Sequence, residues 1–411
     1  MKRILSLLLS CLLLIPSLTG FALTASAKAE TITLYVYNWG EYISDGSEGT
    51  DDTNAMFEEW YLQTYGQRVK VNYSTFSSNE SMYAKLSAGS VNYDVIVPSD
   101  YMIARLIDEG MLAELNYDNI PHITNLDPDF FGPDATLDYY DPDNKYAVPY
   151  MYGMIGIIYN TTMVDENDPA LGSWQLMWDE RHAGNILQFN NSRDAFGTAQ
   201  YFLGLDVNST DEAEWRKALE KLKEQKKVVQ GYVMDEIFNK MENGSAAIAA
   251  YYAGDFLTMY ENNEDLEFFY PKEGTNLYID AMCIPKSSQN KTVAERYIDF
   301  MLTEAPAVAN AEYTYYASPN LAVQENAEYI EYMNSIKEGG YDLMYGTDDV
   351  PTSTYENLDP ETLLLVNTLW EELKSDLEVG LPIYIICAVI LIVLIGGGTF
   401  LGLRKRYRDR Y

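Results

Sequence analysis

The feature that most constrains this chain is a pair of short predicted strands that each end in aromatic and hydroxyl residues. Residues 34–42 (LYVYNWGEY) and 94–101 (DVIVPSDY) both begin with apolar β-formers, which alternate in the first segment and form a bounded run in the second. In an open α/β sheet the carboxyl ends of parallel strands face the ligand-binding crevice. The side chains at these two ends are Trp39, Tyr42, Ser99 and Tyr101. They favour a cleft lined by rings, although an ordinary aromatic core would use the same residues.

The order of the predicted elements indicates an α/β protein with two lobes. Up to residue 109, strands alternate with helical patterns, which is typical of a largely parallel sheet. A second group of strands begins with the apolar segment 153–160. The later strands are predicted at 186–189, 246–252 and 277–285, and the later helices at 211–227, 292–302 and over most of 321–378. At 411 residues the chain is long enough for two domains with their own cores.

The charge of the chain favours a cationic partner. The formal net charge is −34, and both ends are basic, so the central part is more acidic still. Such a body repels nucleic acid and anionic lipid and attracts cations. Tyrosine is also abundant, with 35 residues, many of them beside Asp or Glu. Rings and carboxylates recognise an organic ammonium through cation–π contacts and charge-assisted hydrogen bonds.

The two ends of the chain predict an exported protein with a membrane tether. Residues 1–27 have the basic start, the apolar run and the small-residue cleavage site of a signal peptide. Cys11 lies inside the apolar run rather than at its end, so we expect plain cleavage rather than a lipid anchor. Residues 381–403 carry no charge and are long enough to span a bilayer as a helix. The basic tail 404–411 is expected to be cytoplasmic, which places the ligand-binding body outside the cell. That body contains Cys283 as its only cysteine, so it is expected to fold without a disulfide.

The sequence offers few parts for enzyme chemistry. His122 and His182 are the only histidines, and no G-x-S-x-G or H-E-x-x-H motif occurs. The acidic loop 116–145 lacks the Gly and Glu spacing of a calcium-binding loop. We therefore expect no catalytic residue, no metal and no cofactor. A hydrolase that uses two carboxylates stays open, as do a membrane-tethered sensor and a binding protein for an amino acid, a sugar or a metal ion.

Several motifs along the exported body together resemble the spermidine/putrescine-binding proteins of bacterial ABC importers. These motifs are YNWGEY (37–42), STFSSNESMYAKL (74–86), YDVIVPSDY (93–101), NLDPD (125–129), YAVPYMYG (146–153), SRDAFG (192–197), YID (278–280) and SPNLA (318–322). The resemblance implies a two-lobed, periplasmic-binding-protein-like fold of type II that closes over a protonated polyamine. It also implies that the protein is no enzyme and presents its ligand to ABC permease subunits in the membrane. We expect a monomer.

The resemblance also implies how the chain divides between the lobes. The first lobe is expected to comprise residues 28–150 and 281–318, and the second lobe residues 151–280 and 319–380. Hinge strands are expected where the chain crosses between them, near 149–153 and 280–284.

Carried over by position, the resemblance implies a ligand-binding site formed by Trp39, Tyr42, Ser99, Tyr101, Asp194, Tyr251, Tyr278, Asp280, Tyr316 and Glu356. Asp194, Asp280 and Glu356 are expected to pair with ammonium groups, because a buried charge needs a partner. The chain departs from the usual pattern of the family at five positions. Gly40 stands in place of Thr, Asn191 in place of a carboxylate, Tyr251 and Tyr278 in place of Trp, and Glu356 in place of Gln. Tyrosine keeps a cation–π face. The changes in charge leave open the choice among putrescine, spermidine and spermine.

Overall fold

The computed structural model describes residues 31–89, 91–346 and 349–375. The predicted signal peptide (1–27), membrane helix (381–403) and basic tail (404–411) lie outside these residues. Among the helices of the described part, none is both long enough and apolar enough to cross a bilayer.

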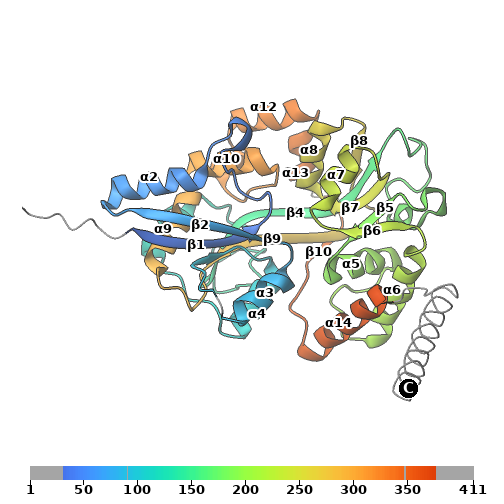
Figure 1. The fold of residues 1–411 in the computed structure, drawn as a ribbon, viewed down its shortest axis with the longest axis horizontal. Helices are drawn as coiled ribbons and strands as arrows, with labels where there is room; N and C mark the ends of the chain where they lie inside the picture. The colour runs from blue at the N-terminus through green and yellow to red at the C-terminus, as the bar shows by residue number, and fades with distance from the viewer. Residues whose placement is uncertain (1–30, 90, 347–348, 376–411) are drawn as a thin grey trace, which may run out of the picture.

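A ten-stranded sheet runs through the molecule and joins its two halves (Figure 1). Its main path is β2-β1-β3-β9-β4-β7-β5-β6, with β8 paired to β4 and β10 to β9. The strands are β1 (Ile32–Trp39), β2 (Val69–Phe76), β3 (Val95–Ile96), β4 (Ala147–Asn160), β5 (Ile186–Phe189), β6 (Val229–Val233), β7 (Ile248–Tyr252), β8 (Leu266–Phe269), β9 (Thr275–Cys283) and β10 (Thr352–Ser353). At one end β1 pairs in parallel with β2 and β3, which confirms the parallel sheet predicted for the N-terminal part. At the other end β5 pairs in parallel with β6 and β7.

Two long strands, β4 and β9, connect the halves. They pair antiparallel, with Ala147 opposite Cys283, and the register shifts just after Pro149. The sequence predicts that this strand starts a few residues later than it does. Proline lacks the N–H that a ladder needs, but it is tolerated at such an irregularity, so the strand continues through it. The predicted hinge segments 149–153 and 280–284 lie in this pair, and the hinge motion itself stays a prediction.

Helices cover the sheet on both sides, with α2 on one side of β1 and β2 and with α3 and α4 on the other (Figure 1). The α-helices are α2 (Thr53–Tyr65), α3 (Asn79–Ser87), α4 (Asp100–Asp108), α5 (Ser192–Leu203), α6 (Glu212–Gln225), α7 (Glu236–Glu242), α8 (Ala253–Asn262), α9 (Lys291–Met301), α10 (Glu304–Thr314), α11 (Leu321–Gln324), α12 (Ala327–Ile336), α13 (Gly340–Tyr345) and α14 (Pro360–Ser375). Short 3-10 helices are Ser47–Gly49, Tyr117–Asn119, Pro121–Asn125, Trp174–Trp178 and Glu180–His182. Local signals set their ends: Asp52 caps α2 by accepting a hydrogen bond from the Ala55 amide at 2.8 Å, and Gly66 ends it at a φ of 69°.

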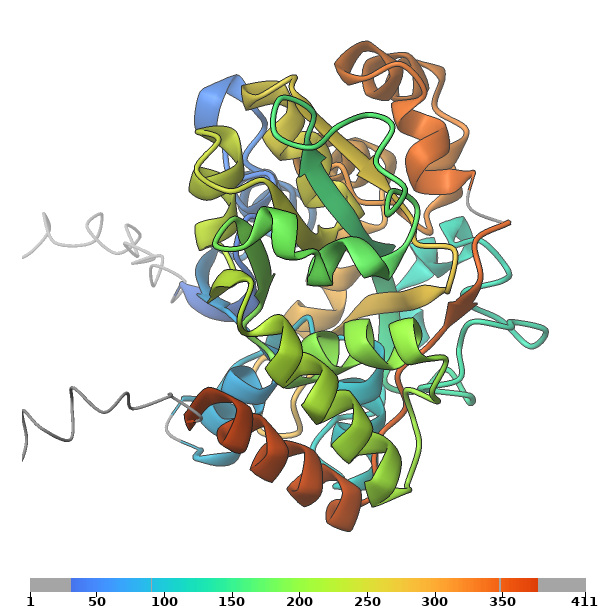
Figure 2. The same ribbon diagram turned by 90° about the vertical axis from the view of Figure 1, so that its right-hand side faces the viewer.

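The C-terminal part is less helical than the sequence predicts. The described residues between α13 and α14 form no helix, and β10 within them pairs with β9. Pro360 explains part of the difference, because a proline opens α14 and disfavours helical backbone in the residue before it. α14 then packs beside α5 and α6 (Figure 2), where Phe196, Trp215 and Leu369 belong to one buried cluster.

Candidate functional site

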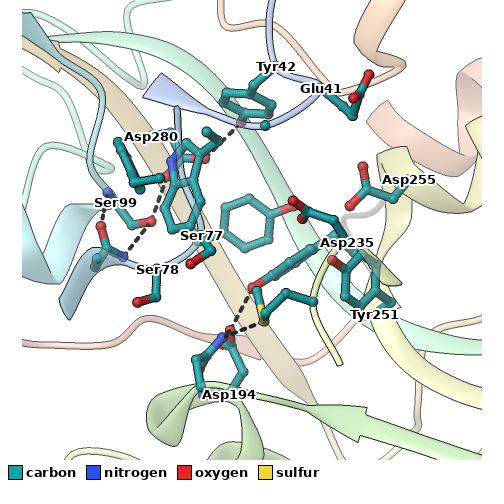
Figure 3. A pocket seen from close by; sticks show the side chains of 18 of the residues that line it. Glu41, Tyr42, Ser77, Ser78, Ser99, Asp194, Asp235, Tyr251, Asp255 and Asp280 are labelled. Atoms are coloured by element: carbon teal, nitrogen blue, oxygen red, sulfur yellow. Dashed lines mark hydrogen bonds between the residues drawn. The ribbon is translucent and has the colours of Figure 1, made fainter. Parts of the chain in front are cut away.

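A pocket lies where strand ends from both halves of the sheet meet (Figure 3). It holds about 810 Å³ of space, its mouth included, which is in the usual range for a small-molecule site. Nine of the ten predicted site residues line it: Trp39, Tyr42, Ser99, Tyr101, Asp194, Tyr251, Tyr278, Asp280 and Tyr316. The fold therefore brings these residues together from across the sequence. Their contact with a ligand stays a prediction.

Asp280, in β9, is 4% exposed and is held by two hydroxyl groups. Its Oδ2 accepts a hydrogen bond from the Tyr42 hydroxyl at 2.7 Å, and its Oδ1 accepts one from Ser99 Oγ at 2.6 Å. Burial raises the pKa of this carboxyl to about 6, while the two hydroxyl donors oppose that rise and the charge of Asp194 adds to it. Neutral donors offset the desolvation only in part, so a cation beside Asp280 would stabilise its charged form.

Asn79 positions two of the predicted site residues. It is the first residue of α3, directly after the cap residue Ser78. Its Nδ2 donates to Ser99 Oγ and to the Tyr101 hydroxyl, both at 3.1 Å, and its Oδ1 accepts from the Ser99 amide at 3.1 Å. The Tyr101 hydroxyl donates in turn to Glu80 Oε1 at 3.0 Å. The sequence indicates only that a helix starts here. The structure shows in addition that the buried side-chain amide of Asn79 orients the hydroxyl groups of Ser99 and Tyr101, which line the pocket.

Asp194 lies in the first turn of α5, which follows β5. Asn191 caps this helix, since its Oδ1 accepts from the Asp194 amide at 2.9 Å, and its Nδ2 donates to Asp194 Oδ2 at 2.6 Å. The Tyr252 hydroxyl donates to the same carboxylate oxygen at 2.7 Å. Burial raises the pKa of Asp194, and these two side-chain donors oppose the rise. Asn191 thus contributes a donor to Asp194 rather than a further negative charge.

Five carboxylates of the pocket were not among the predicted site residues: Glu41, Glu80, Asp100, Asp235 and Asp255. Asp255 Oδ2 accepts a hydrogen bond from the Tyr316 hydroxyl at 2.9 Å. Burial raises the pKa of Asp255 to about 7, the hydrogen bond from Tyr316 opposes the rise, and the charges of Asp235 and Glu41 add to it. Asp255 follows the end of β7, a position where polar residues signal a crevice. Glu41 belongs to the YNWGEY motif and has a left-handed backbone with φ of 49°. Asp235 carries no such signal.

The lining of the pocket is acidic and aromatic. Its carboxylates are Glu41, Glu80, Asp100, Asp194, Asp235, Asp255 and Asp280. Its rings are Trp39, Tyr42, Phe76, Tyr101, Phe238, Tyr251, Tyr252, Tyr278, Tyr316 and Tyr355. Within the part of the chain that the structure describes, no Lys, Arg or His side chain lines it. Carboxylates accept hydrogen bonds from N–H groups and ring faces attract cations, so this lining can hold an organic cation.

Glu356 is the one predicted site residue that the structure does not place in this pocket. Its side chain is exposed, and its backbone amide donates to Asn208 Oδ1 at 2.9 Å. The preceding residue, Tyr355, lines the pocket instead and is 2% exposed. The prediction assumed a helix in this region, but the residues between β10 and α14 form no helix, and Tyr355 is buried where Glu356 is exposed. The structure therefore places Tyr355 rather than Glu356 in the lining of the pocket, and a contact of Glu356 with a ligand stays a prediction.

Two of the pocket tyrosines pack directly over glycine. Gly254, at the start of α8, faces the ring of Tyr316, and Gly197, within α5, faces the hydroxyl of Tyr355. A Cβ added at either glycine would overlap its tyrosine well inside van der Waals contact. Both rings therefore reach their places because the facing helix has no side chain there.

One group of side chains outside the pocket has the ligand types of a metal site. Asp168, Asp179 and His182 are the only such group in the described part of the chain. The guanidinium of Arg181 lies 2.8 Å from Asp168 Oδ2 and also pairs with Asp179. Because Arg181 already neutralises both carboxylates, we assign no metal to this group.

Comparisons with known proteins agree with this geometry. A family model described as bacterial extracellular solute-binding protein matches residues 54–335. The spermidine/putrescine-binding periplasmic protein of Salmonella typhimurium strain LT2 is 31% identical over 307 residues, which cover 74% of this chain and 83% of that protein. The putrescine-binding periplasmic protein of Escherichia coli strain K12 is 30% identical over 310 residues, which cover 72% of this chain and 80% of that protein. The solved structure of a spermidine/putrescine ABC transporter substrate-binding protein from Streptococcus pneumoniae superposes with a TM-score of 0.64 at 32% identity, over 84% of this chain and 98% of that one. These matches confirm the predicted two-lobed α/β fold.

Proposed function

The chain belongs to the family of bacterial extracellular solute-binding proteins, and from this we propose that it captures a protonated polyamine and delivers it to the permease of an ABC importer. Membership of a solute-binding family means that the protein is not an enzyme, so the hydrolase alternative is set aside. The relatives named for spermidine and putrescine support the choice of ligand class.

The observation that carries this proposal is the excess of carboxylates in the pocket. Seven carboxylates line the pocket, and no basic side chain of the described residues lines it. Two of these carboxylates, Asp194 and Asp280, are buried and accept side-chain hydrogen bonds from neutral donors only. Leaving such charges buried and unpaired is unfavourable by several kcal/mol each, roughly. A ligand that brings several ammonium groups would offset this directly, and its methylene groups suit the ring faces between the carboxylates.

Other small solutes fit this lining less well. An amino acid carries a carboxylate that needs a basic partner, and a sugar brings no charge to offset the acidic groups. Arg193, the neighbour of Asp194 in sequence, does not line the pocket. Its guanidinium lies 4.5 Å from the ring of Tyr355 and donates to Asn208 Oδ1 at 3.0 Å. Arg193 therefore lies outside the pocket lining, and its charge acts on Asp194 only by opposing the rise that burial causes in the pKa of that carboxyl.

In this proposal the nine pocket residues predicted from the sequence contact the polyamine, and the lobes 28–150 with 281–318 and 151–280 with 319–380 close over it. The antiparallel pairing of β4 with β9, with its irregularity after Pro149, supports a hinge at this crossing. Closure would give the permease a surface that differs from that of the empty protein. The protein acts as a monomer in this scheme.

We also propose that the protein is exported and tethered to the membrane by residues 381–403. The support is the uncharged apolar sequence of this segment and the basic residues that follow it, together with the signal-like residues 1–27. Alkaline extraction of membranes tests the tether: the full chain should stay in the pellet, whereas a chain ending at residue 380 should be released. Release of the full chain by alkali alone would contradict the tether.

A thermal-shift panel on the full chain in mild detergent tests the ligand class. Putrescine, spermidine and spermine are compared with arginine, glutamate and glucose. An amine at about a hundred times its dissociation constant should stabilise the folded state by about 2.7 kcal/mol. A shift with an amino acid or glucose and none with the amines would overturn the proposal.

A further inference from the structure

The chain between β10 and α14 carries Tyr355 into the wall of the pocket (Figure 1). Tyr355 is 2% exposed, and its ring packs edge to face against the ring of Tyr101 in α4, with centroids 6.2 Å apart and planes at 76°. Two residues later, Asn357 Nδ2 donates to Oδ2 of Asp108, the last residue of α4, at 2.8 Å. We call residues 354–357 the strap, because they connect β10 to a helix that covers the β1 and β2 end of the sheet.

The side-chain amide of Asn208 holds the strap on both sides of Tyr355. Asn208 lies in the loop between α5 and α6. Its Nδ2 donates to the carbonyl of Thr354 at 2.8 Å, and its Oδ1 accepts from the amide of Glu356 at 2.9 Å. A residue of a parallel neighbouring strand would make the same two bonds to the residues that flank Tyr355. One side chain therefore takes the place of a strand partner just beyond the end of β10.

Two residues of α5 complete the support of Tyr355. Arg193 Nη2 donates to Asn208 Oδ1 at 3.0 Å, so the oxygen of that amide, rather than its nitrogen, faces the Glu356 amide. The same guanidinium lies 4.5 Å from the centre of the Tyr355 ring. Gly197 leaves room for the Tyr355 hydroxyl, as a Cβ there would overlap it. Asn208 therefore holds the backbone around Tyr355, while α5 shapes the space for its ring.

We propose that Asn208 is a positioning residue for the ligand pocket, which keeps the Tyr355 ring in the pocket wall and the strap against α4. This inference rests on the proposed function. Asn208 does not line the pocket itself, so it acts on a ligand through Tyr355. Without its side-chain amide, the Thr354 carbonyl and the Glu356 amide lose these partners, and we expect the strap to loosen.

A double-mutant cycle on the full chain in mild detergent tests this role. Calorimetry with spermidine compares the wild type, Asn208→Ala, Tyr355→Ala and the double variant. Asn208→Ala should lower the affinity of the wild type by about tenfold, because two hydrogen bonds that hold the strap are lost. In the Tyr355→Ala background the same change should lower the affinity by less than about twofold, since the effects of residues that act through one contact are not additive. A purely structural role of Asn208 would give the same loss in both backgrounds.

Hydrogen exchange at single amides gives a readout of the strap that needs no ligand. The Glu356 amide, which is bonded to Asn208 Oδ1, should exchange at least about tenfold faster in Asn208→Ala than in the wild type. Asn326→Ala is the matched control. Asn326 is also half-buried, and its Oδ1 accepts from the amides of Glu328 and Tyr329 at 2.9 and 3.0 Å, outside the pocket. This control should leave the spermidine affinity and the exchange of the Glu356 amide as in the wild type.

The outcomes separate this inference from the proposed function. If the wild-type protein binds no amine, the proposed function itself fails, and the role assigned to Asn208 fails with it. If amines bind but Asn208→Ala leaves the affinity unchanged, or lowers it equally in both backgrounds, Asn208 does not position the pocket wall. Unchanged exchange of the Glu356 amide in Asn208→Ala would refute the inference as well.

A second variant replaces Asn208→Ala in the cycle if that chain does not fold. Asn208→Asp keeps the size of the side chain and the acceptor for the Glu356 amide, but it turns an oxygen toward the Thr354 carbonyl. It should therefore also weaken spermidine binding, and the loss should disappear in the Tyr355→Ala background. The same loss in both backgrounds, or none in either, would overturn the inference.

Discussion

Replacing Asp280 by asparagine is expected to stabilise the empty protein and to weaken ligand binding at the same time. The carboxyl is 4% exposed, and its pKa is raised from 3.8 to about 6. A raised pKa means that the folded state holds the proton more tightly than the unfolded chain does. The stability that this group contributes is therefore full below pH 3.8 and is lost as the pH rises through about 6.

The size of the stability effect follows from the shift. A shift of this extent corresponds to a penalty on the order of 3 kcal/mol for the ionised group in the folded state at neutral pH. Asn removes the charge and still offers an oxygen and an N–H to the hydroxyls of Ser99 and Tyr42, so part of this penalty should be recovered. With a polyamine bound the sign reverses, because loss of one member of a buried charge pair weakens binding by roughly 2–5 kcal/mol.

Two measurements check both halves of this prediction. Urea unfolding at pH 7.5 without ligand should give a higher free energy of unfolding for Asp280→Asn than for wild type, and the gain should shrink toward pH 5. Calorimetry with spermidine at pH 7.5 should show the loss of affinity. Asp134→Asn is the matched control, since it removes one negative charge from an exposed position, and it should change both quantities little. A variant that is less stable than wild type when empty, or that binds spermidine equally well, would refute the reasoning.

The other predictions concern packing, position and pH. Gly254→Ala should displace the ring of Tyr316 and weaken spermidine binding by roughly tenfold or more. Gly231→Ala is the control, because a Cβ there meets nothing within 4 Å, and it should leave the affinity unchanged. Equal affinities of the two variants in calorimetry would contradict the packing argument. Glu356→Gln should leave the affinity for spermidine within about twofold of wild type, because this side chain is exposed outside the pocket. A large loss of affinity would show that Glu356 contacts the ligand after all. Polyamine affinity should fall as the pH is lowered from 8 to 5, since Asp255 has a pKa of about 7 and must be ionised to pair with an ammonium; affinity that rises or stays flat over this range would contradict the prediction.

Much of the pocket could be predicted because its residues sit at positions that sequence patterns mark. Trp39 ends a strand, and Ser99 and Tyr101 follow another, so period-two apolar alternation followed by polar and aromatic residues indicates where a crevice begins. Asp194 follows a strand in the same way and opens a helix. Asp280 depends more on the motif YID than on any local rule, because it lies within a strand rather than at its end.

The failures have equally specific causes. The sequence predicts a helix around residue 356, but β10 pairs with β9 just before it and α14 begins only at Pro360, so no helix forms there and Tyr355 lines the pocket. Asp235 is exposed at the surface and carries no pattern of its own. It reaches the pocket because Gly40, on the other side, has no side chain: a Cβ there would lie 3.2 Å from Asp235 Oδ2.

The sequence by itself determined the α/β character, the acidic and tyrosine-rich composition that favours a cationic ligand, and most of the residues at strand ends, because these follow from local periodicity and charge. Only the tertiary structure decided which carboxylates share a space. The contact of Tyr316 with Asp255 joins residues 61 positions apart, and the contact of Tyr42 with Asp280 joins residues 238 apart. Such pairings depend on how β4 and β9 bring the two halves together, which no short-range pattern encodes.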